Sequence, residues 1–271
     1  MKKSLILFFV LCLSSQIYAQ VFWFADTKQA QSVAKQTDKL IIMDFWADWC
    51  GPCKLMDKNL WHHAEMLKIS DSFVCLKLNI DYEKRIAMDY NTQGIPKVVL
   101  TTLNGETIWE KTGFSDAESY LSILRSIPGN VKELNQFIGN LEENKNDAHA
   151  NFLVGKEFQK IGKDLKNKEL KYSFLDCCER YLSKAQKNNK DANLAEEIEL
   201  YSSLNDVYWN RHKKALKKIE KMNSEPKDRL LSELRHYILA YCYKNSNDLT
   251  GFQKEKLMIT SKEYLDQLDN Q

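Results

Sequence analysis

The chain has 271 residues, of which 44% are hydrophobic and 28% charged, a composition typical of a globular protein with one large domain or two ordinary ones. A formal net charge of only +2 gives no electrostatic footprint for nucleic acid, so we expect no nucleic-acid partner. The seven cysteines are scattered and too few for a small disulfide-dense scaffold.

The N-terminus has the layout of a secretory signal peptide. The pair Lys2-Lys3 precedes an apolar run from Leu5 to Leu13, and Ala19 provides a small residue at the predicted cleavage site. The run is too short to span a bilayer, although an uncleaved anchor is the alternative. We therefore predict a signal peptide over residues 1–19, export to the periplasm, and no transmembrane segment after the signal peptide is removed.

Residues 20–127 are predicted to form an α/β domain. The run from Lys39 to Trp46 is apolar except for Asp44, which is typical of a strand buried on both faces. The pair Asn104-Gly105 between two apolar runs indicates a hairpin. The expected result is a mixed central sheet flanked by helices, the last of which has Ser115 as its N-cap. The helices are predicted over residues 26–37, 51–69, 82–89 and 115–126, and the strands over residues 39–46, 73–80, 97–103 and 106–110.

Residues 131–271, after a boundary at 127–130, are predicted to form an all-α domain. Lysine-rich stretches carry apolar residues at helical spacing, such as Phe152, Gly155 and Phe158, and indicate about six or seven antiparallel helices. The spacing suggests a helical repeat, although its period is irregular. Because no catalytic motif occurs here, we interpret this domain either as a partner-binding platform or as a rigid or dimerising appendage.

Two cysteines with functional spacing, Cys50 and Cys53, lie where a predicted strand meets a predicted helix. A thiol attacks a disulfide only as the thiolate, and the N–H groups at a helix N-terminus favour that anion. Gly51 permits a tight turn, and Pro52 suits the first helical turn, where a missing N–H costs nothing. The pattern therefore predicts that Cys50 attacks and that Cys53 resolves the mixed disulfide.

A structural disulfide and a zinc site are the alternatives for this pair. Zinc needs a second pair of ligands, and none occurs at a matching spacing, so we predict no metal site. The only redox group expected is the Cys50–Cys53 disulfide itself, without any cofactor. The other four cysteines of the mature chain, Cys75, Cys177, Cys178 and Cys242, are predicted to be buried packing thiols. For the adjacent pair Cys177-Cys178, a regulatory or second relay disulfide is the alternative.

Four motifs resemble the thioredoxin family. Asp44–Lys54 is similar to its active-site segment and Lys77–Asp81 to its central strand. Gly94-Ile95-Pro96 resembles its cis-proline loop, and Asn104–Gly113 its last hairpin with the following glycine. The motifs occur in family order within residues 21–127, and the C-terminal part resembles nothing in the family. The resemblance implies the thioredoxin fold for the first domain only.

The resemblance also implies roles for single residues. Asp44 is expected to be a buried carboxylate that takes and returns the proton of Cys53, because burial raises the pKa of a carboxyl group. Lys77 on the neighbouring strand is expected to pair with Asp44 and to moderate that pKa. The residues implied in substrate binding, which pair with an extended substrate or offer it an apolar shoulder, are Trp49, Gly51, Pro52, Gly94, Ile95 and Pro96.

The function implied is a thiol–disulfide oxidoreductase of the cell envelope. Gly-Pro between the cysteines and Ile95 before the proline resemble the choices of reducing members, so reduction of cysteine-containing proteins is expected, with a membrane thiol relay as electron donor. Lys58 departs from the family, whose better-known members have a helix-kinking proline there; exported relatives, such as the C-terminal domain of the inner-membrane thiol–disulfide interchange protein, are closer. An oxidase or isomerase with the same cysteines, or a non-enzymatic docking protein, is the alternative.

Overall fold

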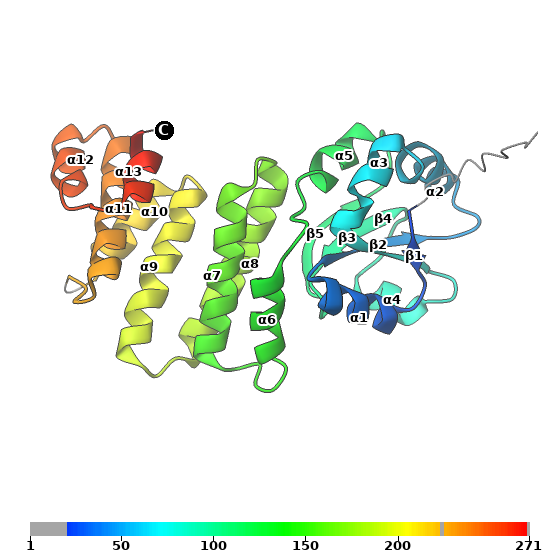
Figure 1. The fold of residues 1–271 in the computed structure, drawn as a ribbon, viewed down its shortest axis with the longest axis horizontal. Coiled ribbons are helices and arrows are strands. Elements are labelled where there is room, and N and C mark those ends of the chain that lie inside the picture. Colours follow the sequence, from blue (N-terminus) through cyan, green and yellow to red (C-terminus); the bar gives the residue numbers. More distant parts are fainter. Residues whose placement is uncertain (1–20, 223–224, 270–271) are drawn as a thin grey trace, which may run out of the picture.

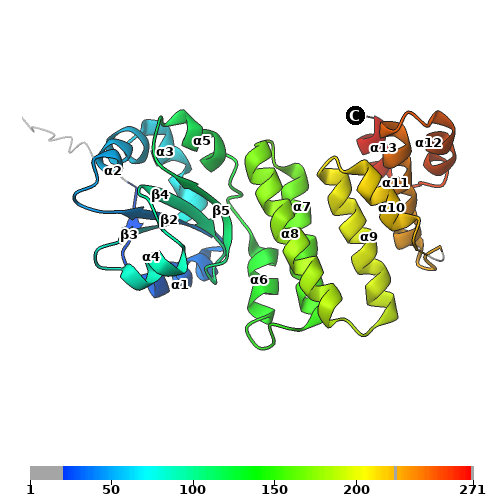
Figure 2. The ribbon, with the colours of Figure 1, turned by 180° about the vertical axis from the view of Figure 1, so that it is seen from behind.

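The computed structural model describes residues 21–222 and 225–269, so the predicted signal peptide lies outside the described residues. Figure 1 shows two parts side by side: a sheet flanked by helices, and an array of helices that extends away from one edge of that sheet. Figure 2 shows the same arrangement from behind. Within the described residues, no helix is both long and apolar enough to cross a bilayer.

The sheet has five strands in the order β1-β3-β2-β4-β5. Strands β1, β3 and β2 are parallel, whereas β4 pairs antiparallel with both β2 and β5, which confirms the predicted mixed sheet. The first strand was not predicted, because two residues are too short for a hydrophobic pattern. The strands are β1 (Trp23–Phe24), β2 (Leu40–Trp46), β3 (Phe73–Asn79), β4 (Lys97–Thr101) and β5 (Thr107–Thr112).

The central strand β2 carries the polypeptide to the reactive cysteines. Every residue from Leu40 to Phe45 is buried, because neighbouring strands flank both edges and helices cover both faces. Asp44 is the one acid in this strand, and it pairs in register with Lys77 of β3 and with Val98 of β4. The strand pairing therefore puts a buried carboxylate and a lysine next to each other.

Helices cover both faces of the sheet. Figure 1 shows α1 (Thr27–Thr37) and α4 (Lys84–Asp89) on one face, and α2 (Gly51–Met56), α3 (Ala64–Ile69) and α5 (Glu118–Leu124) on the other. The expected N-cap at Ser115 was wrong: α5 begins at Glu118, with Ala117 at the cap position. Asp116 satisfies this helix end instead, since its Oδ1 accepts the Ser119 N–H at 2.8 Å.

The single helix predicted over residues 51–69 is divided in the structure. Helix α2 continues into a π-helical turn, Asp57–Trp61, and α3 starts only after His62 and His63. The Asp57 carbonyl lies 2.7 Å from His62 Nδ1, and His63 Nδ1 caps α3 by accepting the Glu65 N–H at 3.2 Å. The π-helical turn thus bends the chain without any glycine or proline, and bonds to the two histidine rings accompany the bend.

The C-terminal part has eight helices within the described residues, rather than six or seven. Helices α7 and α8 pack as an antiparallel pair because two glycines of α7 allow close approach (Figure 2). A Cβ at Gly155 would lie 3.1 Å from Leu182 Cδ2, and one at Gly162 would lie 3.1 Å from Phe174 Cβ. The helices are α6 (Lys132–Asn140), α7 (Ala148–Asp164), α8 (Lys168–Asn188), α9 (Ala192–Tyr208), α10 (His212–Ile219), α11 (Arg229–Asn245), α12 (Leu249–Lys256) and α13 (Lys262–Asp269).

Helix α8 joins the two parts by packing against the edge strand β5. Trp109 Nε1 of β5 donates to Glu169 Oε1 at 2.6 Å, and Arg180 Nη2 donates to the Thr107 carbonyl at 3.0 Å. One apolar core runs continuously from Val21 to Ile198. The helix therefore covers a strand edge that would otherwise be open to pairing with another chain.

Candidate active site

The disulfide Cys50–Cys53 lies where β2 ends and α2 begins, at the predicted strand–helix junction. Cys50 occupies the N-cap position with an extended backbone, and its Sγ accepts the Cys53 N–H at 3.1 Å. Pro52 lies in the first turn, where no carbonyl needs its missing N–H. The helix start thus directs a backbone donor at the Cys50 sulfur, which favours negative charge on that atom.

An apolar cradle surrounds the two sulfurs. Cys50 is 3% exposed and Cys53 is 5% exposed, and both pack with Ala47 against the partly buried side chains of Trp46 and Ile95, among others. Both cysteines are therefore largely covered in the disulfide-bonded protein. A substrate must approach along the surface that borders Cys50.

The residues predicted to bind substrate border this cradle to different degrees. Ile95 packs against the cysteines, and the peptide bond that joins it to the buried Pro96 is cis. Gly94 has little room, since a Cβ there would lie 3.3 Å from Thr112 Cγ2. The other three are exposed: Trp49, Gly51 and Pro52. A Cβ added at Gly51 would meet nothing within 4 Å, so space alone does not demand a glycine there.

Asp44 is a buried carboxyl group with a strongly perturbed pKa. Burial raises its pKa to about 7, the nearby charge of Lys77 opposes that rise, and the charge of Asp57 adds to it. The Trp61 indole also lowers the pKa, although Asp44 Oδ1 and Trp61 Nε1 complete no hydrogen bond of normal geometry with any described residue. A carboxyl group that titrates near neutral pH can both take and return a proton.

Lys77 contacts two carboxylates rather than one. Its Nζ lies 3.8 Å from Asp44 Oδ2, as the sequence predicted, but it contacts Asp57 Oδ1 more closely. The indole of Trp46 lies 5.1 Å from the same ammonium group. Asp57 was missed in the sequence, although its position one helical turn after Cys53 put it on the same helix face. Lys77 therefore only partly neutralises Asp44.

The other four cysteines of the described residues are buried, unpaired packing thiols, as predicted. Burial raises the pKa of Cys75, Cys177 and Cys242 to about 12, and that of Cys178 well above its ordinary value. No disulfide joins Cys177 to Cys178 in this structure. At neutral pH these thiols are protonated and poor nucleophiles.

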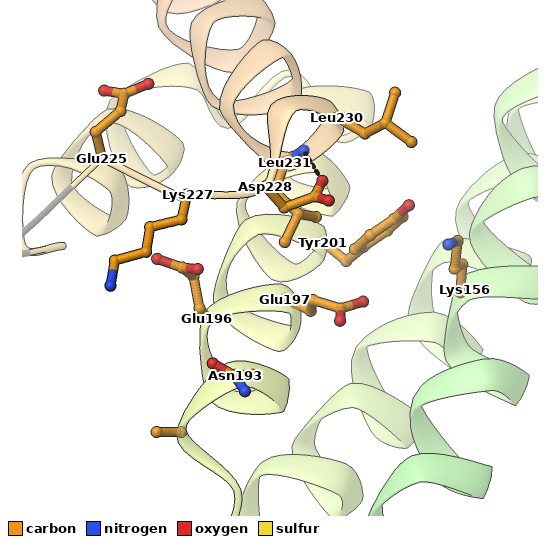
Figure 3. A pocket seen from close by; sticks show the side chains of 11 residues that line it. Lys156, Asn193, Glu196, Glu197, Tyr201, Glu225, Lys227, Asp228, Leu230 and Leu231 are labelled. Carbon is orange, nitrogen blue, oxygen red and sulfur yellow. Dashed lines mark hydrogen bonds between the residues drawn. The ribbon is translucent and has the colours of Figure 1, made fainter.

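A separate cavity of about 710 Å³ lies in the helical array, between α7, α9 and the start of α11 (Figure 3). Glu197 and Tyr201 project into it from α9, Lys156 faces them from α7, and Asp228 and Leu230 border it from the α11 side. Its lining contains none of the residues around the disulfide. The cavity is therefore a feature of the helical part alone.

Comparisons with known proteins place the family relationship in the same segment as the disulfide. The family model for Thioredoxin matches residues 20–126. Thioredoxin-T of Drosophila melanogaster is 41% identical over 69 residues, which cover 26% of this chain and less than half (43%) of that protein. The oxidised C-terminal domain of DsbD from Neisseria meningitidis is 24% identical with a TM-score of 0.33, covering 37% of this chain and 94% of that structure.

A thioredoxin from Rickettsia typhi is matched over a larger part of its own length than Thioredoxin-T is. It is 35% identical over 86 residues, which make up 32% of this chain and 79% of that thioredoxin. That identity, over most of a whole thioredoxin and in the segment that contains Cys50 and Cys53, shows that this chain belongs to the thioredoxin family of thiol–disulfide oxidoreductases.

Proposed function

We propose that this protein is exported to the periplasm and reduces disulfides of cysteine-containing proteins in the cell envelope. A membrane thiol relay then restores its dithiol. The observation that carries the proposal is the Cys50 sulfur at the start of α2, which accepts a backbone N–H at 3.1 Å, together with a buried carboxyl group whose pKa is about 7. The first favours a thiolate nucleophile and the second supplies a proton acceptor.

In the first step, the Cys50 thiolate attacks one sulfur of a substrate disulfide. The substrate S–S bond breaks, a bond forms between Cys50 and the attacked sulfur, and the other substrate sulfur leaves as a thiolate that takes a proton from water. The Cys53 N–H, which contacts Cys50 Sγ in the disulfide, stabilises the thiolate before the attack. The Ile95 side chain packs beside the cysteines and leaves its backbone available to pair with an extended substrate.

In the second step, Cys53 resolves the mixed disulfide. Its thiol gives a proton to the Asp44 carboxylate, and the resulting thiolate attacks Cys50 Sγ. The intramolecular disulfide re-forms, and the second substrate sulfur leaves as a thiolate, so the substrate gains two electrons and the dithiol loses two. A protein dithiol of the relay must return those electrons before the next turnover.

Sequence features support the direction and the location. Pro52 occupies the position next to the second cysteine, where oxidising family members usually have a histidine that stabilises the reduced thiolate. Lys2-Lys3 and the apolar run that follows support export. Fractionation of the native host tests the location. The periplasmic fraction should contain a protein that begins at Gln20, after removal of residues 1–19. An uncleaved protein in the cytoplasmic fraction would contradict the proposed export.

A docking function is the second candidate, and the cavity of about 710 Å³ in the helical array favours it. On that account, the helices bind a partner and the cysteines take no part in turnover. The cavity lies between α7, α9 and the start of α11, whereas the disulfide lies at the start of α2, and Figure 1 shows these helices in different parts of the molecule. Variants at the two places therefore separate the two functions.

Insulin reduction by the mature chain with dithiothreitol decides between these functions. We expect turnover by the wild type, none by Cys50→Ser, and unchanged turnover by Glu197→Gln in the helical cavity. After reduction and removal of dithiothreitol, Cys53→Ser should accumulate a mixed disulfide with insulin, because the resolving thiol is missing, whereas Cys50→Ser should not. Absence of turnover in the wild type would contradict the reductase function and leave docking as the better account.

A further inference from the structure

We propose that two exposed aromatic residues, Trp49 directly before Cys50 and Tyr82 directly after Asp81, form an aromatic ledge that binds the arginine or lysine next to the attacked cystine in a substrate protein. Asp48 and Asp81 border the ledge and supply its negative charge. This inference rests on the proposed reductase function and names the class of substrate that the same site prefers.

Hydrogen bonds between two loops fix the ledge in place. The Trp49 Nε1 donates to Asp81 Oδ2 at 3.0 Å, and Asn79 Nδ2 donates to Asp48 Oδ2 at 3.2 Å. The Asp81 N–H in turn donates to Asn79 Oδ1 at 3.0 Å. The loop after β2, which leads to Cys50, is thereby tied to the loop after β3, where Tyr82 directly follows Asp81.

Both aromatic residues are unusually open to solvent. Trp49 is 67% exposed and Tyr82 is 80% exposed, although residues of this size are normally mostly buried. The indole is held by its bond to Asp81 rather than by burial. A large aromatic surface that is both exposed and held in one orientation is characteristic of an interaction site, since binding it costs little conformational entropy.

The charge of the bordering carboxylates remains free for a ligand. Asp48 Oδ2 accepts a hydrogen bond from the amide of Asn79, and Asp81 Oδ2 accepts one from the indole of Trp49, and both donors are neutral groups. Within residues 21–222 and 225–269, neither forms an ion pair. A guanidinium group stacked on the Trp49 ring can therefore gain a cation–π contact and a carboxylate partner together.

The position of the ledge next to Cys50 indicates that it binds the substrate rather than another partner. The attacked sulfur must come within bonding distance of Cys50 Sγ, and Trp49 is the residue immediately before Cys50. The sulfurs themselves pack against the partly buried side chains of Trp46, Ile80 and Ile95. A substrate residue next to the attacked cystine can therefore reach the exposed Trp49.

Two matched peptides test this inference. Each carries one cysteine as a mixed disulfide with thionitrobenzoate, with arginine beside the cysteine in one peptide and glutamate in the other. Release of thionitrobenzoate by the reduced protein in single-turnover reactions gives the rate constants. We expect the arginine peptide to react on the order of tenfold faster at low salt, and this preference to shrink as salt screens the carboxylates.

Three variants locate the preference. Tyr82→Ser and Asp81→Asn should each lower the rate constant for the arginine peptide about threefold. The Asp81→Asn variant keeps a side-chain oxygen that can accept the Trp49 N–H. The control Met88→Ser removes another exposed apolar side chain, on α4 and 72% exposed, and should change nothing. All variants should reduce hydroxyethyl disulfide, a small uncharged substrate, as fast as the wild type.

The outcomes separate the ledge from the reductase function. Equal rates for both peptides, or equal effects of Tyr82→Ser and Met88→Ser, would overturn the ledge while hydroxyethyl disulfide is still reduced. A wild-type protein that reduces neither the peptides nor hydroxyethyl disulfide would overturn the reductase function and the ledge with it.

Discussion

Replacing Asp44 by asparagine should make the protein more stable, and by an amount that depends on pH. Asp44 is 3% exposed, and its pKa is raised from 3.8 to about 7, chiefly by burial. A difference of about three pKa units corresponds to roughly 4 kcal/mol, at about 1.4 kcal/mol per unit. An asparagine side chain has nearly the same shape without an ionisable group, so packing should change little.

The direction in which stability changes with pH follows from the number of protons that the folded and unfolded states bind. Between about pH 4 and pH 7, Asp44 is ionised in the unfolded chain but protonated in the folded protein, so the unfolded state binds fewer protons. The free energy of unfolding of the wild type therefore falls as pH rises through this window and levels off above it. Relative to wild type, Asp44→Asn should gain about 1–2 kcal/mol at pH 5 and about 4 kcal/mol at pH 8. Loss of one partner of Lys77 makes these values upper bounds.

Urea unfolding of the disulfide-bonded proteins, followed by tryptophan fluorescence at several pH values, measures this difference. The control Asp89→Asn replaces an exposed carboxylate at the end of α4 and should not reproduce this gain in stability. If the difference in free energy of unfolding between Asp44→Asn and the wild type were the same at pH 5 and at pH 8, the raised pKa of Asp44 would be refuted. If the wild type became more stable relative to Asp44→Asn as the pH rose, the predicted direction of the pH dependence would be refuted.

Two further substitutions test the surroundings of the site and the packing of the helices. Asp57→Asn should lower the pKa of Asp44 by about one unit, since the Asp57 charge raises it, and should leave Lys77 closer to full pairing with Asp44; a carboxyl titration followed by NMR that is unchanged would contradict this. Gly155→Ala should destabilise the protein by about 1–3 kcal/mol, because the new Cβ would lie 3.1 Å from a side-chain carbon and 3.3 Å from a backbone nitrogen of α8. In the control Gly139→Ala, the added Cβ has no atom within 4 Å, so this change should stabilise α6 by up to about 1 kcal/mol. If both variants changed the thermal unfolding midpoint equally, the close approach of α7 and α8 would be unimportant for stability.

Much of the sheet was predictable because its signals are local. The apolar run that became β2, the Asn104-Gly105 turn with Gly105 at a φ of 85°, and the cysteine pair each depend on only a few neighbouring residues. The register that places Lys77 beside Asp44 followed from the family resemblance and is present. Stripes of apolar residues likewise predicted the long helices of the C-terminal part.

Other features depend on contacts between residues far apart in the chain. Lys77 and Asp57 are 20 residues apart, and the bend that brings Asp57 toward the lysine is made by a π-helical turn without glycine or proline. Trp109 and Glu169, which join the sheet to α8, are 60 residues apart. Neither pair leaves a periodic pattern, because each is fixed by packing that a local window of sequence does not contain.

The most direct test of the proposed chemistry is the rate at which Cys50 is alkylated as a function of pH, in the reduced protein with Cys53→Ser. The thiolate alone reacts, so the midpoint of the rate profile gives the pKa of Cys50. Because the start of α2 directs the residue-53 N–H at this sulfur, we predict a midpoint near pH 7, about 1.5 units below that of an ordinary thiol. A midpoint at about 8.5, equal to that of an unstructured peptide, would contradict the account.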